Sequence, residues 1–197
     1  MNKYSLSPES IRLLKQIYST LLLAQLNHDI WWFYKEHNNR NKYLKILNRH
    51  LHFFSTSIGA HFTTLVVLLY RLYEKRKDTI NFCSLLNQLR ADNQIDAAQI
   101  ESATQQIANS TQTWKKLGIL RNELFAHLTK EYGPEDIFKK ANLAPEEIKL
   151  FLDNAIKLHG WFSHLMEQGE HLYLGAEKHI KDVLEILFVE SKSESIE

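Results

Sequence analysis

The chain has 197 residues, of which 44% are apolar, so it can bury one substantial core and nothing in its length requires a second domain. Its single cysteine, Cys83, excludes an internal disulfide framework and a zinc site built from several cysteines, and it favours a reducing compartment, which we expect to be the cytoplasm. The net charge of +1 conceals a division, because residues 1–90 carry 13 Lys and Arg against 5 Asp and Glu, whereas residues 91–197 carry 11 against 18. Such a division indicates either a surface that binds polyanions or basic helices packed beside acidic ones.

Helices are predicted from end to end, because Gly and Pro are few and no alternating apolar and polar runs indicate strands. Ser7 is expected to cap the first helix and Pro8 to occupy its first turn. That helix is predicted to reach about Trp32, and a polar break is expected at residues 36–41. Helical spacing of apolar residues then continues through residues 43–54 and 58–72.

The rest of the chain is predicted to form further helices joined by short connections, which favours an all-α antiparallel bundle. A short helix should end at Asp92 or Asn93, and one long or one interrupted helix should stop before Gly133. We expect one domain over residues 1–189, a disordered tail over residues 190–197 and no membrane-spanning segment. The helices are predicted over residues 81–89, 95–129, 135–141, 145–166 and 171–189.

The most informative segment is Leu-Arg-Asn-Glu-Leu-Phe-Ala-His-Leu at residues 120–128, where Arg121 lies inside an apolar arc of the predicted helix. Burying an unpaired guanidinium costs several kcal/mol. Arg121 is therefore expected to find a partner in the fold, to extend to the surface, or to face a polar cleft that binds an anion. The arc is formed by Trp114, Leu117, Leu120, Leu124, Phe125 and Leu128.

His127 projects about 120° from Arg121 and lies about 9 Å further along an ideal α-helix, so the two side chains diverge within one straight helix. They converge if Arg121 extends along the helix, if the helix distorts toward its end, or if a second copy of the chain supplies its own pair across a two-fold axis. Each route implies a cleft.

Other groups that could carry chemistry have simpler interpretations. His50 and His52 are two residues apart and point to different helix faces, so no metal site is predicted, and no cofactor-binding fingerprint occurs. His61 is expected to be a hydrogen-bonded core residue, and Cys83 a small buried one. The aromatic block at residues 31–34 is assigned to a bundle edge or dimer contact, with base stacking as the alternative. Four further histidines are expected at the surface: His159, His164, His171 and His179.

Arg121-Asn122 and Ala126-His127, with five residues between the Arg and the His, resemble the motif of HEPN-domain ribonucleases. Trp114 and the leucines that follow it, with two helices after the Pro-Glu-Asp segment at residues 134–136, resemble the abortive-infection AbiU-type branch of that family. The resemblance implies an HEPN-like helical bundle that forms a two-fold homodimer and cleaves RNA without a metal or other cofactor, in a cleft shared by two protomers. It also implies a role in phage defence or as a toxin.

By this resemblance His127 would act as general base on the ribose 2′-hydroxyl. Arg121 would hold the scissile phosphate, and Asn122 would orient the phosphate or His127. The products would be a 2′,3′-cyclic phosphate and a 5′-hydroxyl, so only RNA would be cut. The general acid is not assigned; the second protomer's His127 and water are both open.

The neighbours of the motif leave several alternatives. Glu123 is expected to form a helix-surface salt link, the alternative being a pair with His127 that raises the pKa of the imidazole. HEPN toxins paired with nucleotidyltransferase antitoxins often carry Tyr two residues after the His, where this chain has Thr129. That difference argues against neutralisation at a tyrosine, although Tyr132 is near, and leaves a different antitoxin or defence-system partner open. RNA contacts could also come from basic residues chosen on charge alone: Lys35, Arg40, Lys42, Lys45, Arg49, Arg71, Lys75, Arg76 and Lys77.

A second hypothesis belongs to another functional class. Many helical bundles bind without catalysis, and fold does not fix function. The alternative is a non-catalytic HEPN-like module for interaction or nucleotide binding, in which Arg121 and His127 bind or support structure.

Overall fold

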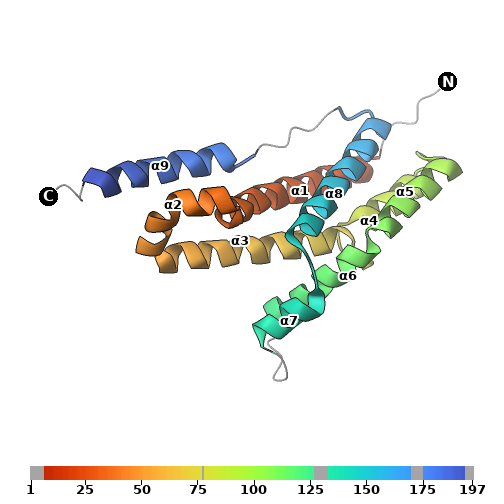
Figure 1. Cartoon of the computed structure of the whole chain (residues 1–197). Coiled ribbons are helices and arrows are strands. Elements are labelled where there is room, and N and C mark those ends of the chain that lie inside the picture. The colour runs from red at the N-terminus through yellow and green to blue at the C-terminus, as the bar shows by residue number, and fades with distance from the viewer. Residues whose placement is uncertain (1–6, 77, 127–132, 170–174, 194–197) are drawn as a thin grey trace. The chain divides into compact units, whose positions relative to one another are not determined.

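The computed structural model describes residues 7–76, 78–126, 133–169 and 175–193 (Figure 1). Within these ranges the chain is built of helices and contains no strand, which confirms the all-α prediction. The helices are α1 (Pro8–Lys35), α2 (His37–Arg49), α3 (Leu51–Leu72), α4 (Phe82–Ala91), α5 (Ala97–Asn109), α6 (Thr111–Ile119), the π-helix η1 (Leu120–Ala126), α7 (Pro134–Ala141), α8 (Pro145–Leu165) and α9 (Glu177–Ser193).

Polar side chains set several of these helix ends. The hydroxyl of Ser7 accepts the backbone N–H of Ser10 at 3.1 Å, which confirms Ser7 as the cap of α1. Asn81 and Ser84 form a reciprocal capping box at the start of α4. The chain between α4 and α5 turns at Asn93, whose φ of 53° lies in the left-handed region, so the predicted end of this helix is confirmed.

Two predicted boundaries differ from the structure. The expected break at residues 36–41 is wrong, because only Glu36 lies outside a helix; its carboxylate accepts the backbone N–H groups of Asn38 and Asn39 and so begins α2 there. The last helix begins at Glu177 and continues to Ser193, which is later than predicted at both ends. The predicted stretch over residues 95–129 is interrupted at Ser110, and its last three residues lie outside the described ranges.

The chain divides into two compact units, residues 1–23 with 66–172 and residues 24–65 with 173–197, and helices α1 and α3 each contribute to both. In the first unit Arg71 donates to Thr20 at 2.8 Å, and in the second His61 and Asn27 are hydrogen bonded at 2.8 Å. In each unit, therefore, a segment of α3 lies beside a segment of α1. The single-domain assignment of residues 1–189 stays a prediction.

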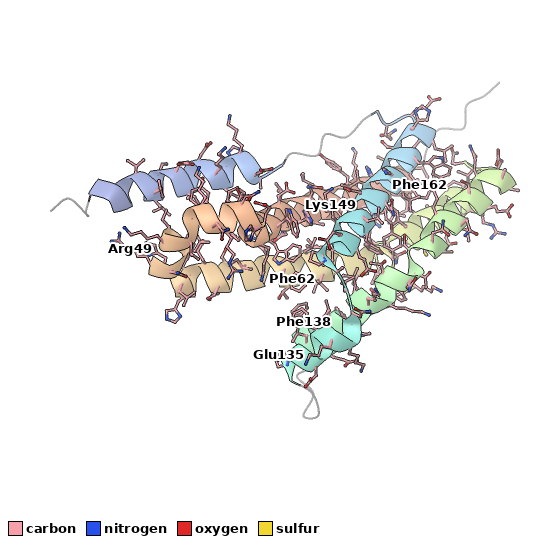
Figure 2. All side chains as sticks on the ribbon, viewed as in Figure 1. Arg49, Phe62, Glu135, Phe138, Lys149 and Phe162 are labelled. Atoms are coloured by element: carbon pink, nitrogen blue, oxygen red, sulfur yellow. The ribbon has the colours of Figure 1, made fainter. Side chains whose placement is uncertain are left out.

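The first unit has an aromatic and leucine-rich core. Phe82 of α4 and Phe162 of α8 are both fully buried and stacked with their ring centroids 6.2 Å apart (Figure 2 labels Phe162). His159 on the same helix is also fully buried and stacks on Tyr18, with ring centroids 5.8 Å apart. The prediction of a surface histidine at this position is therefore wrong, because the apolar face of α8 extends over residue 159.

The second unit contains the aromatic block at residues 31–34 and an ion pair that bears on the division of charge along the chain. Trp31 and Phe33 are buried, and they face Phe62 of α3 and Tyr43 of α2. Trp32 and Tyr34 are half-buried, so the block extends from the interior of the unit to its edge. Tyr43 also donates to the carboxylate of Glu185 on α9 at 2.6 Å. Lys42 pairs with the same carboxylate, so α9, which packs beside the basic α2, neutralises one of its cations. This arrangement accounts for part of the charge division without a polyanion.

By length and composition alone, one described helix, α3, is apolar enough to cross a membrane, with a mean hydropathy of 1.4 over its most apolar window. The core helices of soluble proteins have the same length and composition, and 22% of this window is buried in the structure. The mean hydropathy of α3 is high although its longest apolar run is short, because the residues between its apolar ones are mostly the weakly polar Ser, Thr and Gly.

Candidate active site

The segment that carries Arg121 and Asn122 is not a regular α-helix. It forms the π-helix η1, which continues α6 without a break and has a wider turn, with hydrogen bonds from residue i to i+5. Such π-helical turns are rare and occur often at functional sites. Of the routes by which Arg121 and His127 could converge, a distorted helix is therefore observed. His127, the third predicted site residue, lies outside the described residues.

Arg121 has two partners, and together they explain why a cation lies within an apolar arc. Its guanidinium carbon lies over the ring of Tyr70, 5.3 Å from the centroid, which is a cation–π contact. Its Nη1 donates to the side-chain oxygen of Asn122 at 2.7 Å. The side chain is half-buried, so it stays in contact with solvent. Sequence analysis placed the arginine correctly but did not identify Tyr70, which lies on a helix far away in the sequence.

Tyr70 is itself held by the helix that bears Arg121. The Trp114 ring stacks on it with centroids 5.1 Å apart and an interplanar angle of 16°. The indole nitrogen of Trp114 also donates to the backbone carbonyl of Tyr70 at 3.0 Å. Gly118 lies where the phenol ring comes closest, since a Cβ built there would be 3.1 Å from Cε2 of Tyr70.

Most of the hydrogen-bonding capacity of Arg121 remains available. A guanidinium has five N–H donors, and in the described part of the chain only the bond to Asn122 uses one of them. Asn122 is exposed, and its amide nitrogen makes no hydrogen bond to a described residue. Planar N–H donors suit the oxygens of a phosphate, which a guanidinium can hold with two parallel bonds. Arg121 and Asn122 can therefore receive an anion from solvent together.

Glu123 connects the π-helix to α7. Its two carboxylate oxygens each accept Nζ of Lys140 at 2.8 Å, and the side chains of the pair are 24% and 48% exposed. The predicted salt link is confirmed, although its partner lies on another helix rather than on the same one. Nearby, Lys116 of α6 binds Glu147 at the start of α8, and this hydrogen bond is the main cause that lowers the pKa of Glu147.

The structure distinguishes the basic candidates whose side chains have partners from those whose side chains have none, which charge alone could not do. Lys42 pairs with Glu185, Arg76 pairs with Asp78, and Arg71 is bonded to Thr20. Lys45 and Arg49 have interactions of their own; Figure 2 shows Arg49 at the end of α2. Lys77 lies outside the described residues. Among these candidates, the side chains that form no hydrogen bond or ion pair to a described residue are those of Lys35, Arg40 and Lys75.

An all-α chain that presents Arg and Asn on a distorted late helix, with His six residues after the Arg, has the form of an HEPN-type helical domain. The family model HEPN_AbiU2, described as AbiU2, matches residues 7–186. The chain therefore belongs to the AbiU2 family of HEPN domains, and the resemblance found in its sequence is confirmed. No curated protein and no solved structure matches the chain.

Proposed function

We propose that this protein is a metal-independent endoribonuclease of the HEPN type that acts in abortive infection against phage or as a toxin. The observation that carries the proposal is the state of Arg121, which is fixed by Tyr70 and Asn122 while most of its N–H donors remain free for an anion in the described part of the chain. Membership of the AbiU2 family of HEPN domains supports the same assignment.

The proposed reaction uses the ribose as its own nucleophile. His127 takes the proton of the 2′-hydroxyl, and the 2′-oxygen attacks the adjacent phosphorus. The bond from phosphorus to the 5′-oxygen of the next nucleotide breaks, and that oxygen takes up a proton. The products are a 2′,3′-cyclic phosphate and a 5′-hydroxyl. Arg121 stabilises the charge that develops on the non-bridging oxygens, and Asn122 orients the phosphate or His127.

The proposed site is shared by two copies of the chain in a two-fold homodimer. In this arrangement a second protomer provides a histidine from across the axis. The second protomer's His127 or water then protonates the leaving 5′-oxygen. A cytoplasmic location and a neutralising antitoxin or other defence partner belong to the same proposal.

Cleavage of RNA by the purified protein in excess chelator tests this function. The wild-type chain should release fragments that end in a 2′,3′-cyclic phosphate, whereas His127→Ala and Arg121→Ala should not. Two matched controls, His164→Ala and Arg12→Ala, remove an exposed histidine and an exposed arginine that is ion-paired with Glu9, both outside the motif, and both should cleave like wild type. Cleavage that persists in either motif variant would show that another activity, or a contaminant, is responsible.

The exposure of Arg121 and Asn122 also supports a second candidate function, a non-catalytic HEPN-like module for interaction or nucleotide binding. Both side chains can hold a phosphate without cutting it. Under this alternative the wild-type protein binds RNA or nucleotide in a way that depends on Arg121, yet no fragments form. Measuring binding and cleavage on the same sample separates the two functions.

A further inference from the structure

The stacked pair of Trp114 and Tyr70 forms an aromatic support for Arg121. Trp114 and Arg121 are seven residues apart, which is nearly two helical turns and about 10.5 Å of rise, so both project from the same side of their helix. Gly118 lies between them on that side. The indole of Trp114 and the guanidinium of Arg121 both contact the ring of Tyr70, with 5.1 Å between the two ring centroids and 5.3 Å from the guanidinium carbon to the phenol centroid.

The position of Tyr70 is fixed from its own helix as well. Its neighbours Leu69 and Leu72 are completely buried, which sets the rotation of the last turn of α3. The carbonyl of Tyr70, in the last turn of α3, accepts the backbone N–H of Tyr73 at 3.3 Å. The indole N–H of Trp114 donates to the same carbonyl at 3.0 Å. The phenol ring is therefore held both through its backbone and through its face.

Gly118 is the residue that admits the ring. It is buried within α6, where glycine lowers helix stability relative to alanine. An alanine Cβ at this position would be 3.1 Å from Cε2 and 3.8 Å from Cδ2 of Tyr70, so the ring would have to move by a few tenths of an ångström. The ring of Tyr70 lies close to the position that a side chain at residue 118 would occupy.

We propose that Tyr70 is a positioning residue of the candidate active site, and that Trp114 and Gly118 hold its ring where it fixes the guanidinium of Arg121. The proposal rests on the ribonuclease function for its catalytic consequence, whereas its structural part can be tested in the absence of RNA. A free arginine side chain samples many rotamers, and ordering it against the phosphate in the transition state costs conformational entropy. Contact with the ring limits these rotamers in advance, while most donors on the guanidinium remain available for phosphate.

Three substitutions test this role. Tyr70→Phe keeps the aromatic face and should keep the cleavage rate within about twofold, because the ring rather than the hydroxyl attracts the cation. Tyr70→Leu removes that face and should lower kcat roughly tenfold or more, since small misplacements of catalytic groups cost large factors in rate. Gly118→Ala should give an intermediate loss. Its matched control is Gly160→Ala on α8, where an added Cβ meets nothing within 4 Å and kcat should not change.

Affinity separates positioning from a general loss of structure. The Kd for a non-cleavable 2′-O-methyl RNA should stay within about threefold of wild type in all four variants, because the charge of Arg121 remains in place and supplies the non-specific attraction to phosphate. A fall in kcat with an unchanged Kd, in variants that remain folded at the assay temperature, is the expected signature. If kcat in both Tyr70→Leu and Gly118→Ala equals that of wild type, Tyr70 does not position Arg121.

A readout without RNA keeps this proposal distinct from the ribonuclease assignment. The side-chain N–H signal of Arg121 in a nuclear magnetic resonance spectrum should be shifted by the ring current of Tyr70. The shift should persist in Tyr70→Phe and disappear in Tyr70→Leu. If the wild-type protein cleaves no RNA but the signal behaves in this way, the ribonuclease function fails and the structural role of Tyr70 stands. A signal that is unchanged in Tyr70→Leu overturns the proposal whatever the activity.

Discussion

Glu123 and Lys140 are joined by two hydrogen bonds of 2.8 Å each, and this pair connects the π-helix that carries Arg121 and Asn122 to α7. Helix α7 packs against both α6 and η1, so it lies beside the segment that carries Arg121 and Asn122. Glu123 of this pair directly follows Asn122 in the sequence. Its contribution to the geometry of η1 should therefore exceed its contribution to global stability.

The ion pair can be measured with a double-mutant cycle of Glu123→Gln and Lys140→Met. Because both side chains are partly exposed, the coupling energy for unfolding should be about 0.5 kcal/mol, the size found for such pairs, and should shrink in high salt. Hydrogen exchange at residues 120–126 should accelerate more than global unfolding explains. A coupling of zero at low salt, with unchanged exchange in η1, would show that packing of α7 alone holds the segment.

The core of the first unit gives a larger effect on stability. Phe162→Ala removes a completely buried ring that stacks on Phe82, so the free energy of unfolding should fall by about 3–5 kcal/mol. Leu150→Ala on the same helix is the matched control, because Leu150 is 59% exposed and its loss should change stability by less than about 0.5 kcal/mol. Urea unfolding of the two variants measures the difference. Equal effects would mean that α8 packs through a different face.

The fold was largely predictable because its signals are local. Apolar residues at helical spacing, the cap at Ser7 and the turn at Asn93 each act within a few residues, and each is found where the sequence indicates it. The buried position of His159 was also within reach. Ala155 and Phe162 are buried one turn to either side of it, so periodicity favours the interior although histidine is polar.

The candidate site was predictable only in part, because the contact between Arg121 and Tyr70 joins residues that are far apart in the sequence. The sequence places Arg121 in an apolar arc and so predicts a partner, an extension to the surface or a polar cleft for it. It does not single out Tyr70, which has the pattern of an ordinary aromatic residue near the end of an apolar helix. Which helices become neighbours depends on tertiary packing, and no spacing rule links residue 70 to residue 121. The π-helical turn is equally hidden, because the same residues suit the ordinary α-helical pattern.

A pH prediction follows from Asp92 at the end of α4. Hydrogen bonds from Ser7, then from Ser10 and Gln88, lower the pKa of this carboxyl below its ordinary value of 3.8. The folded chain therefore binds fewer protons than the unfolded chain near this pH. The stabilisation is complete above pH 3.8 and is lost as the pH falls through the lower pKa of the folded state.

Asp92→Asn should accordingly be less stable than wild type at pH 7, and the difference should narrow as the pH falls below 4. Urea unfolding at pH 7, 5, 4 and 3 measures this trend. The control is Asp182→Asn on the exposed side of α9, where no hydrogen bond or ion pair to a described residue is present and the same trend is not expected. A constant difference between Asp92→Asn and wild type at every pH would show that Asp92 contributes packing rather than charge.

The last prediction concerns the shape of the Arg121 side chain rather than its charge. Arg121→Lys keeps one positive charge but replaces the planar fork of donors with a single ammonium group, which cannot form two parallel bonds to a phosphate. Affinity for 2′-O-methyl RNA should change by no more than about threefold, because non-specific attraction to the backbone depends on charge. The rate of cleavage should fall about a hundredfold, the loss expected when a donor to the transition state is removed.

Arg121→Lys separates the two candidate functions at the level of one residue. If the protein is a ribonuclease, binding and cleavage respond differently to the substitution, because only the reaction needs donors directed at the charge that develops on the phosphate oxygens. If the protein binds nucleotide or RNA without cutting it, only affinity can change. Matched losses of rate and affinity in Arg121→Lys would indicate that Arg121 contributes charge alone, and the fixed orientation given to it by Tyr70 and Asn122 would then have no catalytic role.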